Sequence, residues 1–458
     1  MAGVLVLGGG VTGLAAARAA GPTATVLEAG ATPGGLCATY HRTPAGERLA
    51  SPPADGEAYR FEVGGGHWLF GGDAETVAAI EALVPCRTHR RRSSVRLADG
   101  TSVGFPLQHH LAALDDEVRD RALAELLGGD ADHAAGDGPS TMADWVRDRM
   151  GPTLAGLFFD SFHERYTAGL YRRIAPQDPD KSPVDRAAVL AGAGGSGPGD
   201  DGAAGAAHYN ETFRYPVDGL DALVRALTDG VDVRTGSRVV AIDHHTKVVH
   251  TDDGADHPYD RLVSTLPLPV AVDLAGVTVD APPDPHTSVL VVNLGAEPGP
   301  GLGTDHWVYD ATAHSGFHRY GVYSNVDEAF LPRSARSRSA GEAAPSAARR
   351  ASLYVERAYP GGRRPSPAEE DQHVRAMVAE LQERDVVGEV EVVDPTWIET
   401  AYTWSWPGSM WRTEALAALA AVGVHQAGRY GRWRFQGIAA SLAEGRAAGR
   451  AAAGAVTT

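Results

Sequence analysis

The feature of this sequence that most constrains its fold is an ordered series of segments at the amino terminus. The apolar run Val4-Leu-Val-Leu7 is followed by the turn Gly8-Gly-Gly10-Val-Thr-Gly13 and by a helix-forming run, Leu14–Ala20. A second apolar run, Ala24–Leu27, leads to Glu28, about twenty residues after Gly8. Strand, glycine turn, helix, strand and acid in this order predict a β-α-β unit that binds a dinucleotide.

Each element of this unit has a separate physical role. Gly8 allows the tight turn, Gly10 lets the backbone approach a pyrophosphate, and Gly13 lets helix and strand pack closely. The start of the helix presents free N–H groups and the positive end of its dipole to the phosphates. Glu28 is placed to bind ribose hydroxyls. The glycine turn alone would be weak evidence, and the ordered series makes it specific.

Length and composition limit the remaining choices. A chain of 458 residues predicts two or three substructures. No apolar run reaches the length of a membrane span, and nothing basic precedes Val4, so we expect a cytoplasmic protein without a signal peptide. The net charge of −17 argues against nucleic-acid binding and requires that local arginines attract any anionic substrate. With Cys37 and Cys86 as the only cysteines, neither a disulfide framework nor a metal site is expected.

Alternating strands and helices predict an α/β fold. We expect a Rossmann-like domain built from discontinuous segments, a helical insertion, and a mostly antiparallel sheet over the substrate. The expected order is 1–107 (cofactor domain, first part), 108–207 (helical insertion and mobile loop), 208–265 (cofactor domain, second part), 266–410 (substrate sheet) and 411–458 (cofactor domain, carboxyl-terminal segment). Loops are expected at Gly128–Ser140, Ala191–Ala207 and Arg333–Ser352.

Two segments indicate which dinucleotide is bound. Pro33-Gly34-Gly35 resembles the continuation of the glycine turn in FAD enzymes of the amine oxidase and protoporphyrinogen oxidase superfamily. Near the other end, Gly428-Arg429-Tyr-Gly431 precedes Trp433 and the helical run Ala439–Ala452, and it resembles the carboxyl-terminal FAD segment of that superfamily. The resemblance implies FAD as the cofactor.

Further segments resemble the UDP-galactopyranose mutases, particularly the eukaryotic type. Val63-Gly-Gly-Gly66-His67-Trp-Leu-Phe70 is similar to the glycine–histidine loop that lies against the flavin in that family. Phe105-Pro-Leu-Gln108 is similar to its uracil-binding stretch, and Asn210-Glu-Thr-Phe-Arg-Tyr-Pro216 is similar to a segment near the nucleotide. The resemblance runs in patches from Val4 to about Gly445.

The resemblance also implies roles for single residues. Arg186, on a mobile loop, and Arg319 would bind the diphosphate, and arginine is suited to bidentate phosphate contact. Together with His67, these arginines are the expected catalytic residues. The expected substrate-binding residues are Phe105, Gln108, Asn210, Tyr309, Arg319, Tyr402 and Phe435.

In that family the flavin is not a redox shuttle. The resemblance implies that N5 of reduced FAD attacks the anomeric carbon of a nucleotide sugar and displaces the diphosphate, after which the sugar recloses as its ring isomer. No protein nucleophile is required. Reduction must come first, and because the sequence has no second dinucleotide fingerprint, NAD(P)H as the reductant would have to approach the flavin from the substrate side.

The chain departs from the family pattern mainly on the substrate side. The family's lysine is Gly169 here, a tryptophan is Tyr171, a substrate tyrosine is Phe435 and an asparagine is Ala439. Each lost donor would weaken the binding of a desolvated charge by about 1–3 kcal/mol. These changes allow a different nucleotide sugar or a related reaction.

Two other functions share the same cofactor motifs. One is an FAD oxidase or dehydrogenase of the amine oxidase type, which takes hydride from a C–N or C–C bond. The other is a binding protein without turnover. The segments 210–216 and 317–325 favour the sugar-nucleotide mutase.

Overall fold

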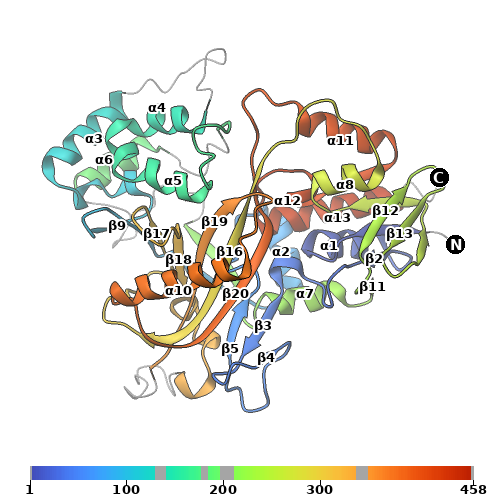
Figure 1. The fold of residues 1–458 in the computed structure, drawn as a ribbon, viewed down its shortest axis with the longest axis horizontal. Helices are drawn as coiled ribbons and strands as arrows, with labels where there is room; N and C mark the ends of the chain where they lie inside the picture. Colours follow the sequence, from blue (N-terminus) through green and yellow to red (C-terminus); the bar gives the residue numbers. More distant parts are fainter. Residues whose placement is uncertain (1–2, 129–140, 177–183, 196–210, 337–348, 455–458) are drawn as a thin grey trace.

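The computed structural model describes residues 3–128, 141–176, 184–195, 211–336 and 349–454. Figure 1 shows three parts: a helical lobe, a long-stranded twisted sheet, and a layered α/β part at which both termini lie. The three parts meet near the middle of the molecule, where the functional cavity described below is found.

The α/β part is built on a parallel sheet of five strands. The strand β1 (Val4–Leu7) is buried at all four residues, as expected for a strand covered on both faces. Helices α1 (Val11–Ala20) and α13 (Ile438–Gly454) pack against each other beside this sheet. The strand order is β11 (Asp232–Arg234), β2 (Thr25–Leu27), β1 (Val4–Leu7), β15 (Arg261–Ser264) and β21 (Val424–Gln426).

The second sheet has seven strands and is antiparallel except where β17 (Trp307–Asp310) and β8 (Ser93–Arg96) pair in parallel. Helix α10 (Pro367–Glu383) packs on one face through Val374, Met377 and Leu381. A capping box between Ser366 and Glu369 starts this helix. The strand order is β20 (Val387–Thr403), β16 (His286–Pro298), β19 (Ala351–Pro360), β18 (Arg319–Val322), β17 (Trp307–Asp310), β8 (Ser93–Arg96) and β9 (Ser102–Gly104).

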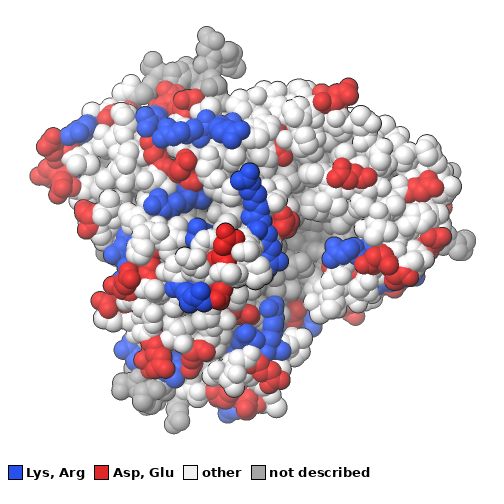
Figure 2. Space-filling model, viewed as in Figure 1, with Lys and Arg blue, Asp and Glu red and all other residues white. Residues whose placement is uncertain are grey.

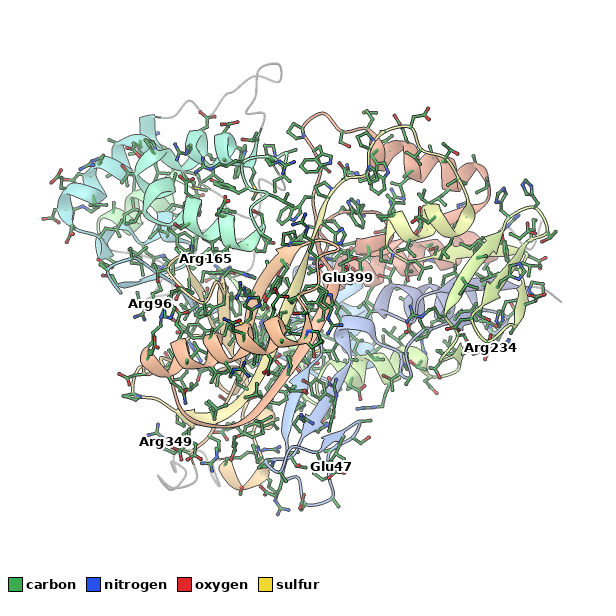
Figure 3. All side chains as sticks on the ribbon, viewed as in Figure 1. Glu47, Arg96, Arg165, Arg234, Arg349 and Glu399 are labelled. Carbon is green, nitrogen blue, oxygen red and sulfur yellow. The ribbon has the colours of Figure 1, made fainter. Side chains whose placement is uncertain are left out.

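The helical lobe consists of α3 (Asp116–Gly128), α4 (Met142–Leu154), α5 (Asp160–Tyr166) and α6 (Arg186–Ala193). Apolar side chains join the lobe to the edge of the seven-stranded sheet, since Val95 and Val103 belong to the same buried cluster as Val146 of α4. Polar contacts with loops next to the sheet add to this attachment. The Arg165 guanidinium donates to the carbonyl of Ala313 at 3.4 Å, and Figure 3 shows Arg165 where the lobe faces the sheet. The backbone N–H of Ala175 donates to the carbonyl of Ser405 at 2.8 Å.

Shorter elements complete the fold. Three small sheets contain β4 (Arg48–Leu49), β3 (Thr39–Arg42) and β5 (Tyr59–Glu62); β6 (Leu69–Phe70), β10 (Thr212–Pro216) and β7 (Cys86–Arg90); and β12 (Val239–Asp243), β13 (Val248–Thr251) and β14 (Asp256–Pro258). The remaining helices are α2 (Ala74–Leu83), α7 (Leu220–Thr228), α8 (Leu268–Ala275), α9 (Tyr323–Val326), α11 (Trp411–Ala421) and α12 (Gly428–Gly431).

The predicted fold class is confirmed: the chain has a Rossmann-like sheet, a helical insertion and a mostly antiparallel second sheet. One boundary differs. The strands β8 and β9 were expected in the cofactor domain but pair at the edge of the seven-stranded sheet, because β8 runs parallel to β17. The segment 191–207 was expected to be a loop, but its first residues extend α6 to Ala193. Residues 129–140, 196–207 and 337–348 of the three expected loops lie outside the described residues.

The surface in Figure 2 carries acidic and basic side chains interspersed. The net negative charge of the chain is therefore not gathered into one acidic patch on this face. Within the described residues, no helix is long and apolar enough to cross a lipid bilayer.

Candidate active site

A cavity of about 1120 Å³ is lined by residues from all three parts of the molecule. Its volume exceeds the roughly 300–1,000 Å³ of a typical small-molecule site, so it has room for a large cofactor together with a second ligand. Twelve of the residues expected from the sequence line it: Gly8, Gly10, Gly35, Gly66, His67, Phe105, Tyr309, Arg319, Tyr402, Gly428, Arg429 and Phe435.

The glycine turn after β1 forms one end of the cavity. Gly8 has a φ of 97°, which favours glycine, and an added Cβ on Gly10 would meet no atom within 4 Å. Gly13 lies inside the fold instead, where a Cβ would be 2.0 Å from the carbonyl oxygen of Gly8. No side chain caps the start of α1 at Gly10. Free N–H groups beside open space fit an anionic pyrophosphate.

Glu28 lies outside the cavity and accepts hydrogen bonds from the backbone of this turn. Its carboxylate accepts hydrogen bonds from the N–H of Gly9 at 2.7 Å and from the N–H of Gly30 at 2.6 Å. Glu28 is not among the lining residues, so in this structure the carboxylate braces the turn.

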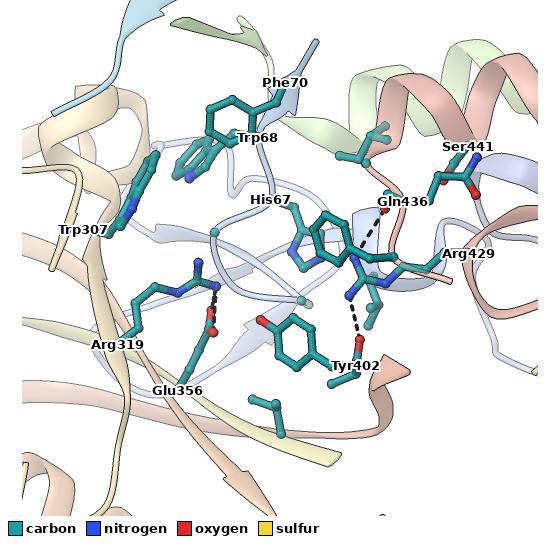
Figure 4. Close-up of a pocket in the computed structure, with 18 of the residues that line it drawn as sticks. His67, Trp68, Phe70, Trp307, Arg319, Glu356, Tyr402, Arg429, Gln436 and Ser441 are labelled. Atoms are coloured by element: carbon teal, nitrogen blue, oxygen red, sulfur yellow. Dashed lines mark hydrogen bonds and ion pairs between the residues drawn. The ribbon is translucent and has the colours of Figure 1, made fainter. Parts of the chain in front are cut away.

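The carboxyl-terminal segment approaches the same turn. Gly428, with a φ of 81°, starts α12, and a Cβ there would be 2.6 Å from Oγ1 of Thr12. The Arg429 guanidinium donates to the carbonyl of Ala401 at 2.8 Å and to that of Gln436 at 3.3 Å (Figure 4). Gly431 is again a packing position, because a Cβ would lie 2.8 Å from the side-chain oxygen of Gln426.

The glycine–histidine loop lies between the two ends of the cavity. A Cβ on Gly66 would be 2.1 Å from the Tyr354 hydroxyl, so the loop lies directly on β19. Burial and, to a smaller extent, the nearby positive charge of Arg429 lower the pKa of His67 to about 4. The imidazole is therefore neutral at pH 7 and can accept as well as donate a hydrogen bond.

Arg319 lines the other end of the cavity, where it is paired with a carboxylate. It lies opposite Tyr309 in the β17–β18 register, and its Nη2 donates to both carboxylate oxygens of Glu356, at 2.6 and 2.7 Å (Figure 4). Burial alone raises the carboxyl pKa of Glu356, but Arg319 and His318 together lower it to about 2. The pair is ionised and largely buried, and it sets the direction of the guanidinium.

Aromatic side chains from the sheet and the helical lobe surround Arg319. The ring of Phe105 lies 4.7 Å from that of Tyr309, and Tyr166 lies 4.6 Å from Tyr402, measured between ring centroids. The rest of this wall comes from the helical lobe: Met142, Trp145, Phe158, Phe159 and Phe162. Such a wall can exclude water and receive flat rings.

Two expected substrate residues, Arg186 and Gln108, do not line the cavity, and a third lies outside the described residues. Arg186 is exposed at the start of α6, and its guanidinium donates to the carbonyl of Leu127 at 3.3 Å. Its expected convergence with Arg319 is therefore wrong for this structure, because α6 holds it on the helical lobe. Gln108 is buried in the turn Leu107–His109 behind the lining residues. Asn210 lies outside the described residues.

The structure adds residues that the sequence reasoning missed. Glu356 is a carboxylate that directly follows the mostly apolar run Ala351–Val355, and this pattern could have indicated a buried ion pair. The run Arg90-Arg91-Arg92 at the end of β7 lines the cavity and was visible as three consecutive basic residues. Trp68 and Trp307 form a stacked pair on the same wall, with ring centroids 6.5 Å apart.

Two departures from the expected pattern have local explanations. Gly169 has a φ of 86° in the turn after α5, a conformation that would strain a lysine. Phe435 does line the cavity, and its ring lies 4.5 Å from the guanidinium carbon of Arg429. Its aromatic face contacts this cation, as a tyrosine ring also could, and only the hydroxyl of a tyrosine is missing.

The glycine turn is of the dinucleotide-binding type, and it opens into a cavity that a second sheet also lines. This arrangement is typical of two-domain proteins that bind a nucleotide cofactor beside a substrate. Residues 6–80 match the NAD(P)-binding Rossmann-like domain, and residues 203–456, more than half of the chain, match the family described as flavin containing amine oxidoreductase. The chain belongs to this flavin-containing family. No curated protein matches it in sequence.

Solved structures share the fold at low sequence identity. A reduced UDP-galactopyranose mutase is 20% identical with a TM-score of 0.79, covering 100% of this chain and 97% of the other. Wild-type putrescine oxidase bound to putrescine is 15% identical with a TM-score of 0.58, covering 100% and 99%. An oxidoreductase from Methanosarcina mazei is 14% identical with a TM-score of 0.55, covering 96% and 98%.

The open space beside Gly10 leads to a first prediction. Gly10 has a φ of −72°, so Gly10→Val is expected to fold normally but to place its side chain where the pyrophosphate would lie. Flavin affinity should fall by about 100-fold, measured by fluorescence titration of the apoprotein with FAD. Gly303→Val, at an exposed position with open space for a Cβ, is the control. Unchanged flavin content in Gly10→Val would contradict this placement.

The lowered pKa of His67 predicts acid sensitivity. The unfolded chain takes up a proton near pH 6.5 and the folded chain only near 4, so stability falls as the pH falls through this window. His67 should contribute about 1–3 kcal/mol of this loss, measured by urea unfolding between pH 7 and 4.5. His67→Asn should lose less stability than the parent, while the exposed His425→Asn serves as the control. Parallel pH profiles for the parent and His67→Asn would refute the prediction.

Proposed function

We propose that this flavoprotein isomerises a nucleotide diphosphate sugar, exchanging its pyranose and furanose ring forms. The observation that carries the proposal is Arg319, which is held by Glu356 and flanked by Tyr309 in the cavity that begins at the glycine turn. A guanidinium at this position can hold a diphosphate while the sugar lies toward the flavin.

The charge of the cavity supports an anionic substrate. Five arginines line it (Arg90, Arg91, Arg92, Arg319 and Arg429) against three carboxylates (Glu211, Asp305 and Glu356), and the neighbouring His67 is neutral at pH 7. This local excess of positive charge stands within a chain of net charge −17. It favours a phosphate-bearing ligand and repels a protonated amine.

The protein groups bind and orient the substrate. Glu356 keeps Arg319 in one direction, so less side-chain entropy is lost when a phosphate arrives. Burial raises the pKa of Tyr402, and the phenols of Tyr309 and Tyr402 can both donate to phosphate or sugar oxygens. The aromatic wall excludes water and keeps the displaced diphosphate close to the sugar.

When bound in its reduced form, the flavin supplies a nucleophilic nitrogen and is regenerated at the end of the cycle. Reduction is required first, and NAD(P)H or another reductant would reach the flavin through the same cavity. Its volume of about 1120 Å³ leaves room for a second ligand beside the flavin.

The family match also favours a second function, an FAD oxidase or dehydrogenase of the amine oxidase type. Both functions use the glycine turn and the Gly428 segment. The arginines count against a cationic amine, whereas an anionic oxidase substrate would fit them. The two functions differ in their redox requirement.

The deciding experiment is anaerobic incubation of the flavin-loaded protein with UDP-, GDP- and dTDP-sugars, before and after reduction with dithionite. We expect an isomer of unchanged mass, detected by chromatography and NMR, with reduced protein only. Denatured protein and free reduced FAD are the controls. Consumption of a substrate by the oxidised protein, with hydrogen peroxide as product, would support the oxidase and refute the mutase.

The role of Arg319 can be measured directly. The double variant Arg319→Met, Glu356→Gln removes the ion pair without leaving a buried carboxylate uncompensated. Affinity for the nucleoside diphosphate should fall about 10- to 100-fold by calorimetry, while FAD affinity stays within about twofold. The single variant Glu356→Gln shows how much of the lost affinity is due to Glu356 and how much to Arg319. Equal diphosphate affinity in the parent and the double variant would refute the assignment.

A further inference from the structure

Arg186 does not line the cavity, so the second positive charge expected to bind the proposed diphosphate must come from another residue. A nucleotide diphosphate carries two negative charges, and Arg319 is already paired with Glu356 at 2.6 Å. The Arg319–Glu356 pair is neutral as a unit, so a second cation is needed on the substrate side of the cavity. Burying a charge without compensation is costly, so this cation should itself be partly desolvated.

The arginine run at the end of β7 offers three candidates with different environments. The Arg92 guanidinium donates to the carbonyls of Thr304 at 2.9 Å and Asn325 at 3.0 Å, and Arg90 lies 3.6 Å from the carboxylate of Glu211. The Arg91 guanidinium makes no hydrogen bond or ion pair with any described residue; its guanidinium carbon lies 5.1 Å from the centre of the Phe105 ring.

Arg91 is also held in position. Its backbone N–H donates to the carbonyl of Glu211 at 2.8 Å, and its half-buried side chain lines the cavity. Burial lowers the pKa of the guanidinium, and the neighbouring Tyr309 and Glu211 act in the opposite direction. A guanidinium remains charged under these conditions, so Arg91 is a cation whose side-chain donors have no acceptor among the described residues.

Tyr309 connects Arg91 with Arg319. Tyr309 is opposite Arg319 in the β17–β18 register, its ring lies 4.7 Å from that of Phe105, and Phe105 lies under Arg91. Both guanidiniums are close enough to the Tyr309 phenol for it to influence them electrostatically. The two arginines thus flank one phenol on the same wall.

We propose that Arg91, in the short link between β7 and β8, is the second phosphate-binding arginine of this chain. It takes the role that was expected of Arg186 from the sequence. It contacts the phosphate nearer the base, beside Phe105, while Arg319 contacts the phosphate nearer the sugar. The inference rests on the proposed function, since it concerns the nucleotide diphosphate of that reaction. It makes Arg91 a substrate-binding residue and α6 dispensable for phosphate contact.

The test measures binding to the flavin-loaded protein of UDP, GDP and dTDP, and of the corresponding nucleosides. Arg91→Met should weaken the diphosphate that the parent binds about 10- to 100-fold by calorimetry. Nucleoside binding, followed by ligand-observed NMR, should change less than about twofold. Arg91→Lys, which keeps the charge but loses the planar fork, should fall between parent and Arg91→Met. Arg375→Met, an exposed arginine on α10, controls for loss of one charge.

Each other outcome has a distinct meaning. If the parent binds a diphosphate and Arg91→Met binds it equally well while the Arg319 double variant does not, the Arg91 assignment is wrong and the proposed function stands. If Arg91→Met slows only the reduction of the flavin by NADPH, Arg91 serves the reductant and the assignment to substrate is overturned. If the parent binds none of the diphosphates, the proposed function fails and the inference fails with it.

Discussion

The arrangement of the whole cavity depends on the close packing of the last helix of the chain against the first. A Cβ on Gly445 would lie 2.2 Å from the carbonyl oxygen of Thr12, and one on Gly449 would lie 2.0 Å from that of Ala16. Only glycine permits this backbone contact between α13 and α1. The contact places the Gly428 turn against Thr12, so the two ends of the chain together form the cofactor end of the cavity.

The substrate end depends on a different constraint, the register of three neighbouring strands. Arg319 lies opposite Tyr309 on β17 and opposite Glu356 on β19. Because the register is set along the whole antiparallel sheet, the guanidinium, the carboxylate and the phenol keep fixed relative positions. A buried ion pair contributes little net stability, and its value here is orientation of Arg319 toward the cavity.

The cofactor motifs could be located from the sequence because their physical requirements are local. The run from Val4 to Glu28 has a strand, a turn, a helix and a second strand within one short segment, and the structure has β1, α1 and β2 at these positions. The helix after Gly431 was expected at Ala439–Ala452 and is observed at Ile438–Gly454. Arg186 was placed by resemblance rather than by a local pattern, and α6 holds it away from the cavity. Glu356 lies in β19 and Arg91 in the link between β7 and β8, and each acquires a role only from side chains that are distant in the sequence.

By itself, then, the sequence determined the secondary structure around the glycine turns, the fold class, and the identity of residues such as Gly10, His67, Arg319 and Tyr402 that line the cavity. The tertiary structure alone decided which arginines share that cavity and which carboxylates neutralise them. The physical reason is that glycine turns and helix starts act over a few residues, whereas the charge balance of a cavity depends on side chains hundreds of residues apart. Their distances are set by strand register and helix packing rather than by any local pattern.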